Sequence, residues 1–309
     1  MTPCTSALAQ TSAHGVLRLV VPSAPGSVLD QYARRLAPGL GRELGESVVV
    51  ENRAGADGLP AIDAVARAPA DGNSLLMTGI NTLCITPAMY PKQRIEPLRL
   101  FTPISLIARG YPLLLAHPHT APNSLPTLMT STASTAAELR FASPGVRSVQ
   151  HLAGRMMQER TGLRLLYVQY ANQAQAMQDL MAGHTDLSIE YGSVSVPLVK
   201  AGKLKALAVL GPQRNPALPD LMTAREQGIA DMEVGAWAGM VAPDGTAPAR
   251  IQRLRETLHR VMQEREFVAW VTGLGSTPAP SSSQTFADVI QHDSARWARQ
   301  VVAAGMVVP

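Results

Sequence analysis

Short apolar runs alternate with segments of helical period along most of this chain, and that alternation limits the fold more than any other feature. From Leu17 onward, runs rich in leucine and β-branched residues are followed by segments whose apolar residues recur every three or four positions. This order is typical of parallel strands joined by crossover helices, so the sequence predicts an α/β fold. We expect strands at residues 17–21, 48–50, 75–78, 104–108, 113–116, 165–170, 187–191, 204–210 and 234–241. Besides the first helix, which is described next, we expect helices at residues 61–68, 148–160, 173–182, 194–201, 248–264 and 283–304.

The first helix has the clearest pattern. One stripe of apolar residues, at spacings of three and four, predicts a buried face: Leu29, Ala33, Leu36, Leu40 and Leu44. Ser27 and Asp30 have the spacing of a capping box at its start. Pro38 lies inside the stripe, and because proline removes a backbone donor there, the sequence predicts a kinked helix.

Two apolar segments, residues 107–116 and 234–241, are spaced so that each can carry the chain from one lobe to another. We therefore expect two lobes with a ligand cleft between them. Residues 15–110 together with 236–309 form the first lobe, which is discontinuous, and residues 111–235 form the second.

Composition and charge exclude several classes of protein. Hydrophobic residues make up 46% of the 309 positions, enough for sizeable cores. The formal net charge is only +4 and the basic residues are scattered, so no nucleic-acid partner is expected. Two cysteines, Cys4 and Cys84, exclude a disulfide framework. No apolar run approaches the roughly 18 residues that a bilayer-crossing helix needs.

The N-terminal segment has one recognisable pattern. Ala7, Leu8 and Ala9 form the small-x-small triplet that signal peptidase cleaves, ahead of Gln10. The basic and strongly apolar regions of a full signal peptide do not precede it. Residues 1–14 are interpreted either as a leader remnant or as a disordered polar tail.

Polar loops follow several of the expected strands, and these are the candidate binding residues. In α/β sheets, ligands bind beyond the carboxyl ends of the strands, where amide groups at helix N-termini favour an anion. The alternative interpretation is that the loops are ordinary turns, because the same residue types mark turns in any protein. The candidates are Ala24, Gly26, Ser27, Asn81, Thr82, Ser143, Gly145, Arg147, Ser148, Tyr170 and Glu190.

Enzyme motifs are absent from the sequence. There is no dinucleotide fingerprint, P-loop, zinc-protease motif, nucleophile elbow or C-x-x-C, so we predict no catalytic residue and no cofactor. His117 and His119 place two imidazoles together, but a metal site needs three or four ligands, so no metal is expected. Cys84 is expected to be buried and inert.

Ordered motifs across nearly the whole chain identify a family. Residues 17–30 (LRLVVPSAPGSVLD), 48–58 (VVVENRAGADG), 141–154 (FASPGVRSVQHLAG) and 201–209 (AGKLKALAV) occur in that order, with Asp71-Gly72, residues 87–90 (PAMY) and residues 217–220 (ALPD) between or after them. In these motifs the sequence resembles the substrate-binding proteins of tripartite tricarboxylate transporters, also called Bug receptors.

The resemblance implies a periplasmic binding protein fold of the second type, whose two α/β lobes are joined by crossover strands and close over a small carboxylate. It implies a periplasmic receptor, acting as a monomer, that passes a small anionic metabolite to integral membrane transporter subunits. Loop residues near Gly26 and Ser27, and those from Ser143 to Ser148, would hold the ligand's carboxylate. The alternatives are an enzyme that reuses the fold, and a ligand-sensing partner of a membrane sensor.

Two departures from the family pattern concern the ligand. Arg147 replaces a glycine, and its guanidinium either pairs with a second carboxylate or points to solvent. Glu190 and Tyr191 replace the usual Asp-Asn pair, so Glu190 is a candidate partner for a ligand ammonium or for Arg147. An amino-dicarboxylate and an amide-bearing acid both remain open as ligands.

Overall fold

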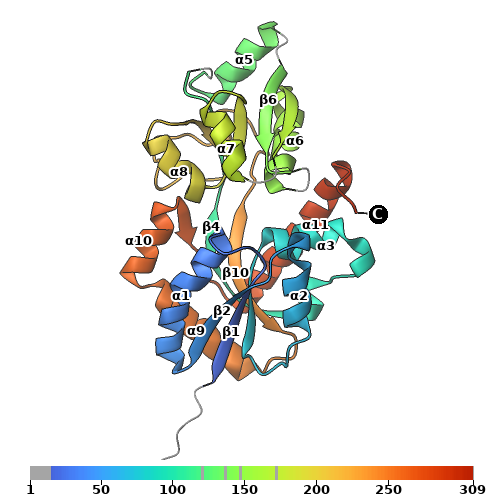
Figure 1. The fold of residues 1–309 in the computed structure, drawn as a ribbon, viewed down its shortest axis with the longest axis vertical. Coiled ribbons are helices and arrows are strands. Elements are labelled where there is room, and N and C mark those ends of the chain that lie inside the picture. Colours follow the sequence, from blue (N-terminus) through green and yellow to red (C-terminus); the bar gives the residue numbers. More distant parts are fainter. Residues whose placement is uncertain (1–14, 120–121, 136–137, 146–147, 171–172, 309) are drawn as a thin grey trace, which may run out of the picture.

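Two β-sheets, one above the other along the long axis, organise the molecule (Figure 1). The computed structural model describes residues 15–119, 122–135, 138–145, 148–170 and 173–308. The first sheet has the order β11-β4-β10-β3-β1-β2 and the second has the order β7-β6-β8-β5-β9. Each sheet has helices beside it, so the predicted α/β organisation is observed in both halves.

The first sheet combines N-terminal and C-terminal strands. Its strands are β1 (Val16–Val21), β2 (Ser47–Asn52), β3 (Ser74–Gly79), β4 (Phe101–Gly110), β10 (Ala236–Pro243) and β11 (Ser276–Pro278). Strand β1 pairs in parallel with β2 and β3, whereas β10 is antiparallel to β3 and β4. The main helices of this half are α1 (Val28–Leu44), α2 (Leu59–Ala66), α9 (Pro248–Met262), α10 (Arg265–Gly273) and α11 (Ser283–Ala303). Short helical turns complete it: η1 (Ala56–Gly58), η2 (Asn81–Ile85), α3 (Thr86–Met89), η3 (Pro91–Gln93) and α4 (Pro97–Leu100).

The second sheet is built from the middle of the chain. Its strands are β5 (Leu113–Ala116), β6 (Glu138–Ser143), β7 (Arg164–Gln169), β8 (Leu187–Glu190) and β9 (Lys205–Val209). Strand β6 pairs in parallel with β7 and β8, and β5 is antiparallel to β8 and β9. The helices of this half are α5 (Leu125–Thr135), α6 (Val149–Thr161), α7 (Gln173–Met181) and α8 (Gly192–Lys200).

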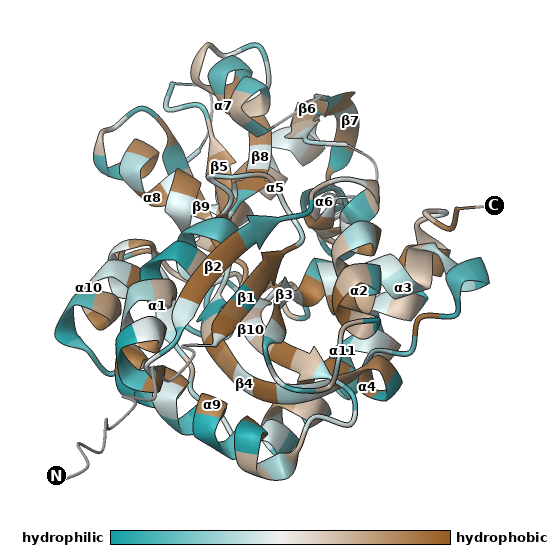
Figure 2. Cartoon of the chain, turned by 60° about the horizontal axis from the view of Figure 1, so that its bottom comes forward, coloured by the Kyte–Doolittle hydropathy of each residue, from teal (hydrophilic) through white to brown (hydrophobic). Residues whose placement is uncertain are grey.

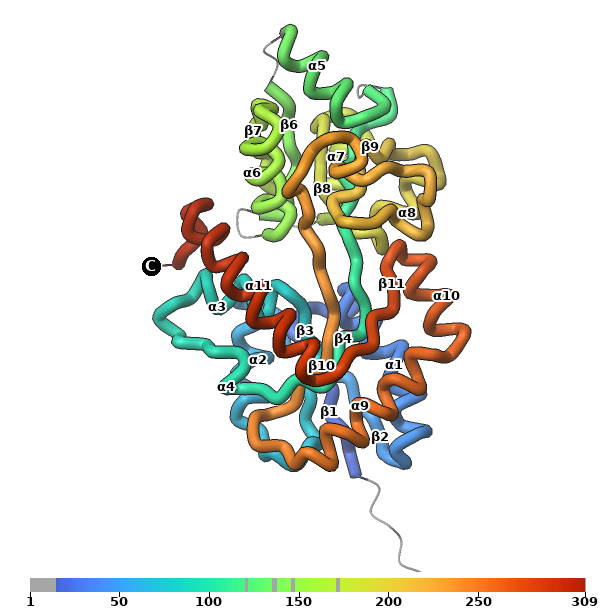
Figure 3. The backbone as a smooth tube through the Cα atoms, turned by 180° about the vertical axis from the view of Figure 1, so that it is seen from behind, coloured from blue at the N-terminus to red at the C-terminus, as the bar shows by residue number. Residues whose placement is uncertain are grey.

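The chain passes between the sheets at two places. Only Tyr111 and Pro112 separate β4 of the first sheet from β5 of the second, and the chain returns after β9 to form β10. Strands β4 and β10 pair with each other and run side by side between the halves (Figure 3). The apolar segments 107–116 and 234–241 lie at these transitions. Where one lobe ends and the other begins stays a prediction.

Helix α1 forms as its apolar stripe predicts and runs through Pro38. A Cβ atom on the neighbouring Gly39 would lie 2.6 Å from Val261 Cγ1, so the missing side chain allows α1 to pack closely on α9. Apolar colour is concentrated on the central strands and polar colour on the outer helix faces (Figure 2). One cluster of buried side chains extends through both halves and includes Leu76 in β3 and Leu114 in β5.

Several elements differ from the sequence expectation. Strand β6 was not expected because Glu138 and Arg140 interrupt its apolar pattern. Arg140 donates from its backbone amide and its guanidinium to Asp186, with the closest contacts at 2.7 Å, so a tertiary partner makes the charged residue compatible with a strand. Helix α5 covers Leu125–Thr135, a segment that is not among the helices expected from the sequence. Helix α10 and strand β11 were also not expected.

Candidate functional site

The loop between β1 and α1 is held in place by one buried carboxylate. Asp30 is 2% exposed, and its Oδ2 accepts the backbone N–H of Gly26 at 2.8 Å. Asn52 Nδ2 donates to Asp30 Oδ1 and to the carbonyl of Ser23, both at 2.9 Å, and Arg34 Nε donates to Asp30 at 2.9 Å. Burial favours the neutral acid, but the hydrogen bonds from Arg34, Gly26 and Asn52 outweigh it and hold the pKa of Asp30 below its usual value. The loop therefore has a fixed backbone.

The predicted capping box forms only in part. Ser27 Oγ accepts the amide of Asp30 at 3.3 Å, as expected for an N-cap residue. The Asp30 carboxylate reaches the amide of Gly26 rather than that of Ser27. Gly26 has φ of +83°, a conformation that glycine adopts without strain. The Gly26 amide is thus already engaged by Asp30.

Three loops of the first sheet converge at the carboxyl ends of β1, β2 and β3. A Cβ atom on Gly58 would lie 3.2 Å from Pro22 Cβ and 3.4 Å from Thr82 Cγ2. Gly58 also has φ of +93°, so a side chain there is disfavoured by conformation as well as by space. Thr82 is buried and Asn81 is exposed. The structure therefore brings Thr82 close to the β1–α1 loop.

Loops of the second sheet are joined by hydrogen bonds. The amide of Tyr170 donates to the carbonyl of Ser143 at 3.0 Å, and Ser148 Oγ donates to the carbonyl of Gly145 at 2.8 Å. Ser148 also caps α6 by accepting the amide of His151 at 3.1 Å. The Tyr170 hydroxyl donates to Asp179 Oδ2 at 2.7 Å, so it contacts α7.

Glu190, the last residue of β8, is a buried carboxyl group. It is 3% exposed, and Oε1 accepts the amide of Tyr191 at 2.7 Å. Gln150 Nε2 lies 3.5 Å from Oε2, at the outer limit of a hydrogen bond. Burial raises the pKa of Glu190 to about 7, against the weaker opposing effect of these two donors. Ser143, Gly145, Ser148, Tyr170 and Glu190 thus belong to one connected group of loops.

The carboxyl ends of the parallel strands in both sheets point toward the boundary between the two halves (Figure 1). Near these ends lie buried polar atoms with no hydrogen-bond partner among the residues described by the structure: Thr78 Oγ1, both amide atoms of Gln173, Tyr191 Oη and Ser193 Oγ. Buried polar groups normally have a partner. These five atoms, out of twelve such atoms among the described residues, are therefore candidates for contact with a small polar ligand.

Four of these residues are not among the candidates predicted from the sequence, although all lie at or just after predicted strands: Thr78, Gln173, Tyr191 and Ser193. The predicted candidate Tyr170 has its hydroxyl paired with Asp179 in the structure. Ala24 lies in the loop held by Asp30. Arg147 lies outside the described residues. The assignment of all these residues to ligand binding stays a prediction.

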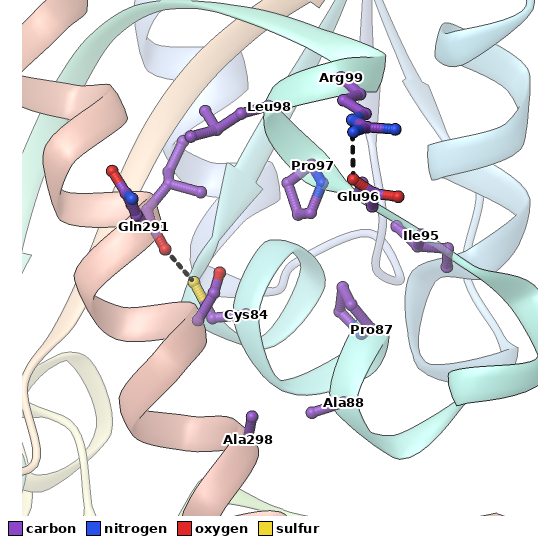
Figure 4. A pocket seen from close by; sticks show the side chains of 12 residues that line it. Cys84, Pro87, Ala88, Ile95, Glu96, Pro97, Leu98, Arg99, Gln291 and Ala298 are labelled. Carbon is purple, nitrogen blue, oxygen red and sulfur yellow. Dashed lines mark hydrogen bonds and ion pairs between the residues drawn. The ribbon is translucent and has the colours of Figure 1, made fainter.

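Apart from these loops, the described residues form a groove that contains a buried thiol. A groove of about 470 Å³ lies between α4 and α11, on the face shown in Figure 4. Cys84 lines it, and its side chain is buried, as expected. Burial raises the pKa of this thiol to about 12. Within the ranges that the structure covers, no three His, Cys, Asp or Glu side chains gather as metal ligands would. Of the helices in those same ranges, none has both the length and the apolar character needed to cross a bilayer.

Comparisons with known proteins agree with this architecture. The family model described as tripartite tricarboxylate transporter family receptor matches residues 32–306. The periplasmic binding protein BugD has a similar structure, with a TM-score of 0.80 and 32% identity over 94% of this chain and 98% of BugD. MatC from Rhodopseudomonas palustris with bound malate has a TM-score of 0.78 and 29% identity, covering 93% of this chain and 98% of MatC. Rpa4515 from R. palustris with adipate has a TM-score of 0.83 and 28% identity, covering 96% of this chain and 98% of Rpa4515.

The fold and these comparisons define a solute-binding receptor of the periplasmic binding protein class. The chain belongs to the tripartite tricarboxylate transporter receptor family, as its sequence motifs indicate. The predicted fold class is confirmed. Members of this family are transporter receptors and not enzymes, which confirms the prediction that the chain catalyses no reaction.

Proposed function

We propose that this chain captures a small carboxylate-bearing metabolite in the periplasm and delivers it to the membrane subunits of a tripartite tricarboxylate-type transporter. The observation that carries the proposal is the set of partnerless buried polar groups near the strand ends of both sheets. Malate bound to MatC and adipate bound to Rpa4515 support a carboxylate as the ligand class. The periplasmic location of BugD supports the compartment.

The proposed receptor is a monomer of two lobes, residues 15–110 with 236–309 and residues 111–235, that close over the solute. Each lobe then contains one sheet. Amide groups and polar side chains from both would replace the water around the carboxylate, as helix N-termini do for anions. Arg147 remains a candidate for a second carboxylate under this proposal.

A thermal-shift panel of mono-, di- and tricarboxylates, amino acids and aromatic acids tests the proposal. A ligand at a hundredfold excess over its Kd should stabilise the folded protein by about 2.7 kcal/mol. Chromatography should recover the compound unchanged. The proposed function would be contradicted if no carboxylate in the panel stabilised the protein, or if the protein consumed the compound.

Replacing Gly26 with valine should remove ligand-dependent stabilisation. A Cβ atom at Gly26 meets no atom within 4 Å, so the effect comes from φ of +83°, which costs a β-branched residue on the order of 1–3 kcal/mol and displaces the loop. Gly45 provides a matched control, because it has φ of +70°, is equally open and lies at the other end of α1. Gly45→Val should lower the melting temperature to a similar degree but keep ligand stabilisation. Equal ligand response in the two variants would place the site elsewhere.

A further inference from the structure

Glu190 differs from the other strongly buried carboxylate near the strand ends. Asp30 is paired with the Arg34 guanidinium, whereas the contacts of Glu190 are two neutral donors, the Tyr191 amide and the Gln150 side chain. Among the residues that the structure describes, no cationic side chain forms an ion pair with Glu190. A buried carboxylate without a cation is unstable unless it is protonated or a positive charge is supplied.

Glu190 also lies at the boundary between the two halves. Two residues after it, Gly192 packs against the turn between α10 and β11, where a Cβ atom would lie 2.3 Å from the carbonyl oxygen of Leu274. The hydroxyl groups of Tyr191 and Ser193, on either side of Gly192, are among the partnerless polar groups. The Glu190 carboxyl group is therefore close to the place where the proposed solute binds.

We propose that Glu190 is a specificity-determining residue and that it selects solutes carrying a protonated amine beside a carboxylate, in preference to plain or hydroxylated dicarboxylates. This inference rests on the proposed function, because it concerns the ligand of the same site. The ligand carboxylate would be held by the polar loops, and its ammonium group would donate a charge-assisted hydrogen bond to Glu190.

The charges of the two ligand classes explain the selection. A dicarboxylate such as malate or adipate places its negative charge beside Glu190 in a region shielded from water, where like charges repel strongly. An amine-bearing counterpart places a positive charge there. With its pKa raised to about 7 by burial, Glu190 is readily ionised by a neighbouring ammonium group, which favours the charged carboxylate.

Two matched ligand pairs test the inference by isothermal titration calorimetry at about pH 8. Aspartate differs from malate by an ammonium group in place of a hydroxyl group, and 2-aminoadipate differs from adipate by an added ammonium group. The full chain should bind the amine-bearing member of at least one pair about tenfold to a hundredfold more tightly, the range expected for a hydrogen bond to a charged group. In Glu190→Gln, which keeps the shape and removes the charge, this preference should disappear.

Glu159→Gln is the matched control, because Glu159 is an exposed glutamate on α6. This variant should keep the wild-type preference. If the wild-type protein binds malate and adipate as tightly as aspartate and 2-aminoadipate, this inference is overturned, whereas the proposed function is not. An unchanged preference in Glu190→Gln has the same consequence. If none of the four compounds binds and no carboxylate in the thermal-shift panel stabilises the protein, the proposed function is overturned and this inference with it.

Discussion

The free energy of unfolding of Glu190→Gln, measured relative to that of the wild type without ligand, is expected to increase by about 3 kcal/mol as pH rises from about 4.5 to about 8. Burial raises the pKa of Glu190 from 4.5 to about 7, and each pKa unit corresponds to about 1.4 kcal/mol. Between these two pKa values the folded protein binds more protons than the unfolded chain, so wild-type stability falls as pH rises. Glutamine does not titrate, so the variant lacks this loss.

Urea unfolding of both proteins without ligand, at several pH values, measures this difference. Glu159→Gln also replaces a glutamate with glutamine, but at an exposed position on α6, and it is the control variant. A Glu190→Gln difference that stays constant from about pH 5 to about pH 8 would mean that Glu190 is ionised at little cost in the folded protein.

Replacing Asp30 with alanine should cost about 3 kcal/mol of stability and weaken ligand binding at least tenfold, because several charge-assisted hydrogen bonds are lost together. The substitution removes the acceptor of the Gly26 amide and the charge that fixes Arg34 and Asn52. The loop after β1 then loses its fixed backbone. Urea unfolding measures the stability, and titration with the best carboxylate of the panel measures the binding.

Asp63→Ala is the matched control for this variant. Like Asp30, Asp63 forms an ion pair with an arginine four residues later in the same helix: Asp63 Oδ1 lies 2.6 Å from Arg67 Nε. The side chain of Asp63, however, is 60% exposed. Such surface pairs contribute less than about 1 kcal/mol. If Asp30→Ala were as stable as Asp63→Ala and bound ligand normally, the carboxylate of Asp30 would have no role in holding the loop.

Local patterns predicted the elements whose signals lie within one segment. Helix α1 follows its stripe of leucines, and Ser27 caps it as its position indicates. Strand β3 is buried throughout, as an apolar run in the middle of a sheet should be. Strand β6 was missed because Arg140 is acceptable there only when Asp186, 46 residues later, lies beside it.

At the candidate site, the sequence determined the fold class, the family and the loops that follow the strands, because these depend on periodicity and on motifs of adjacent residues. It did not determine which groups in those loops are already occupied. The amide of Gly26 is taken by Asp30, the hydroxyl of Tyr170 by Asp179, and the carboxyl of Glu190 is buried with two neutral donors. Only the tertiary structure decides this, because a side chain's partners and its exposure to water depend on residues that are distant in the chain.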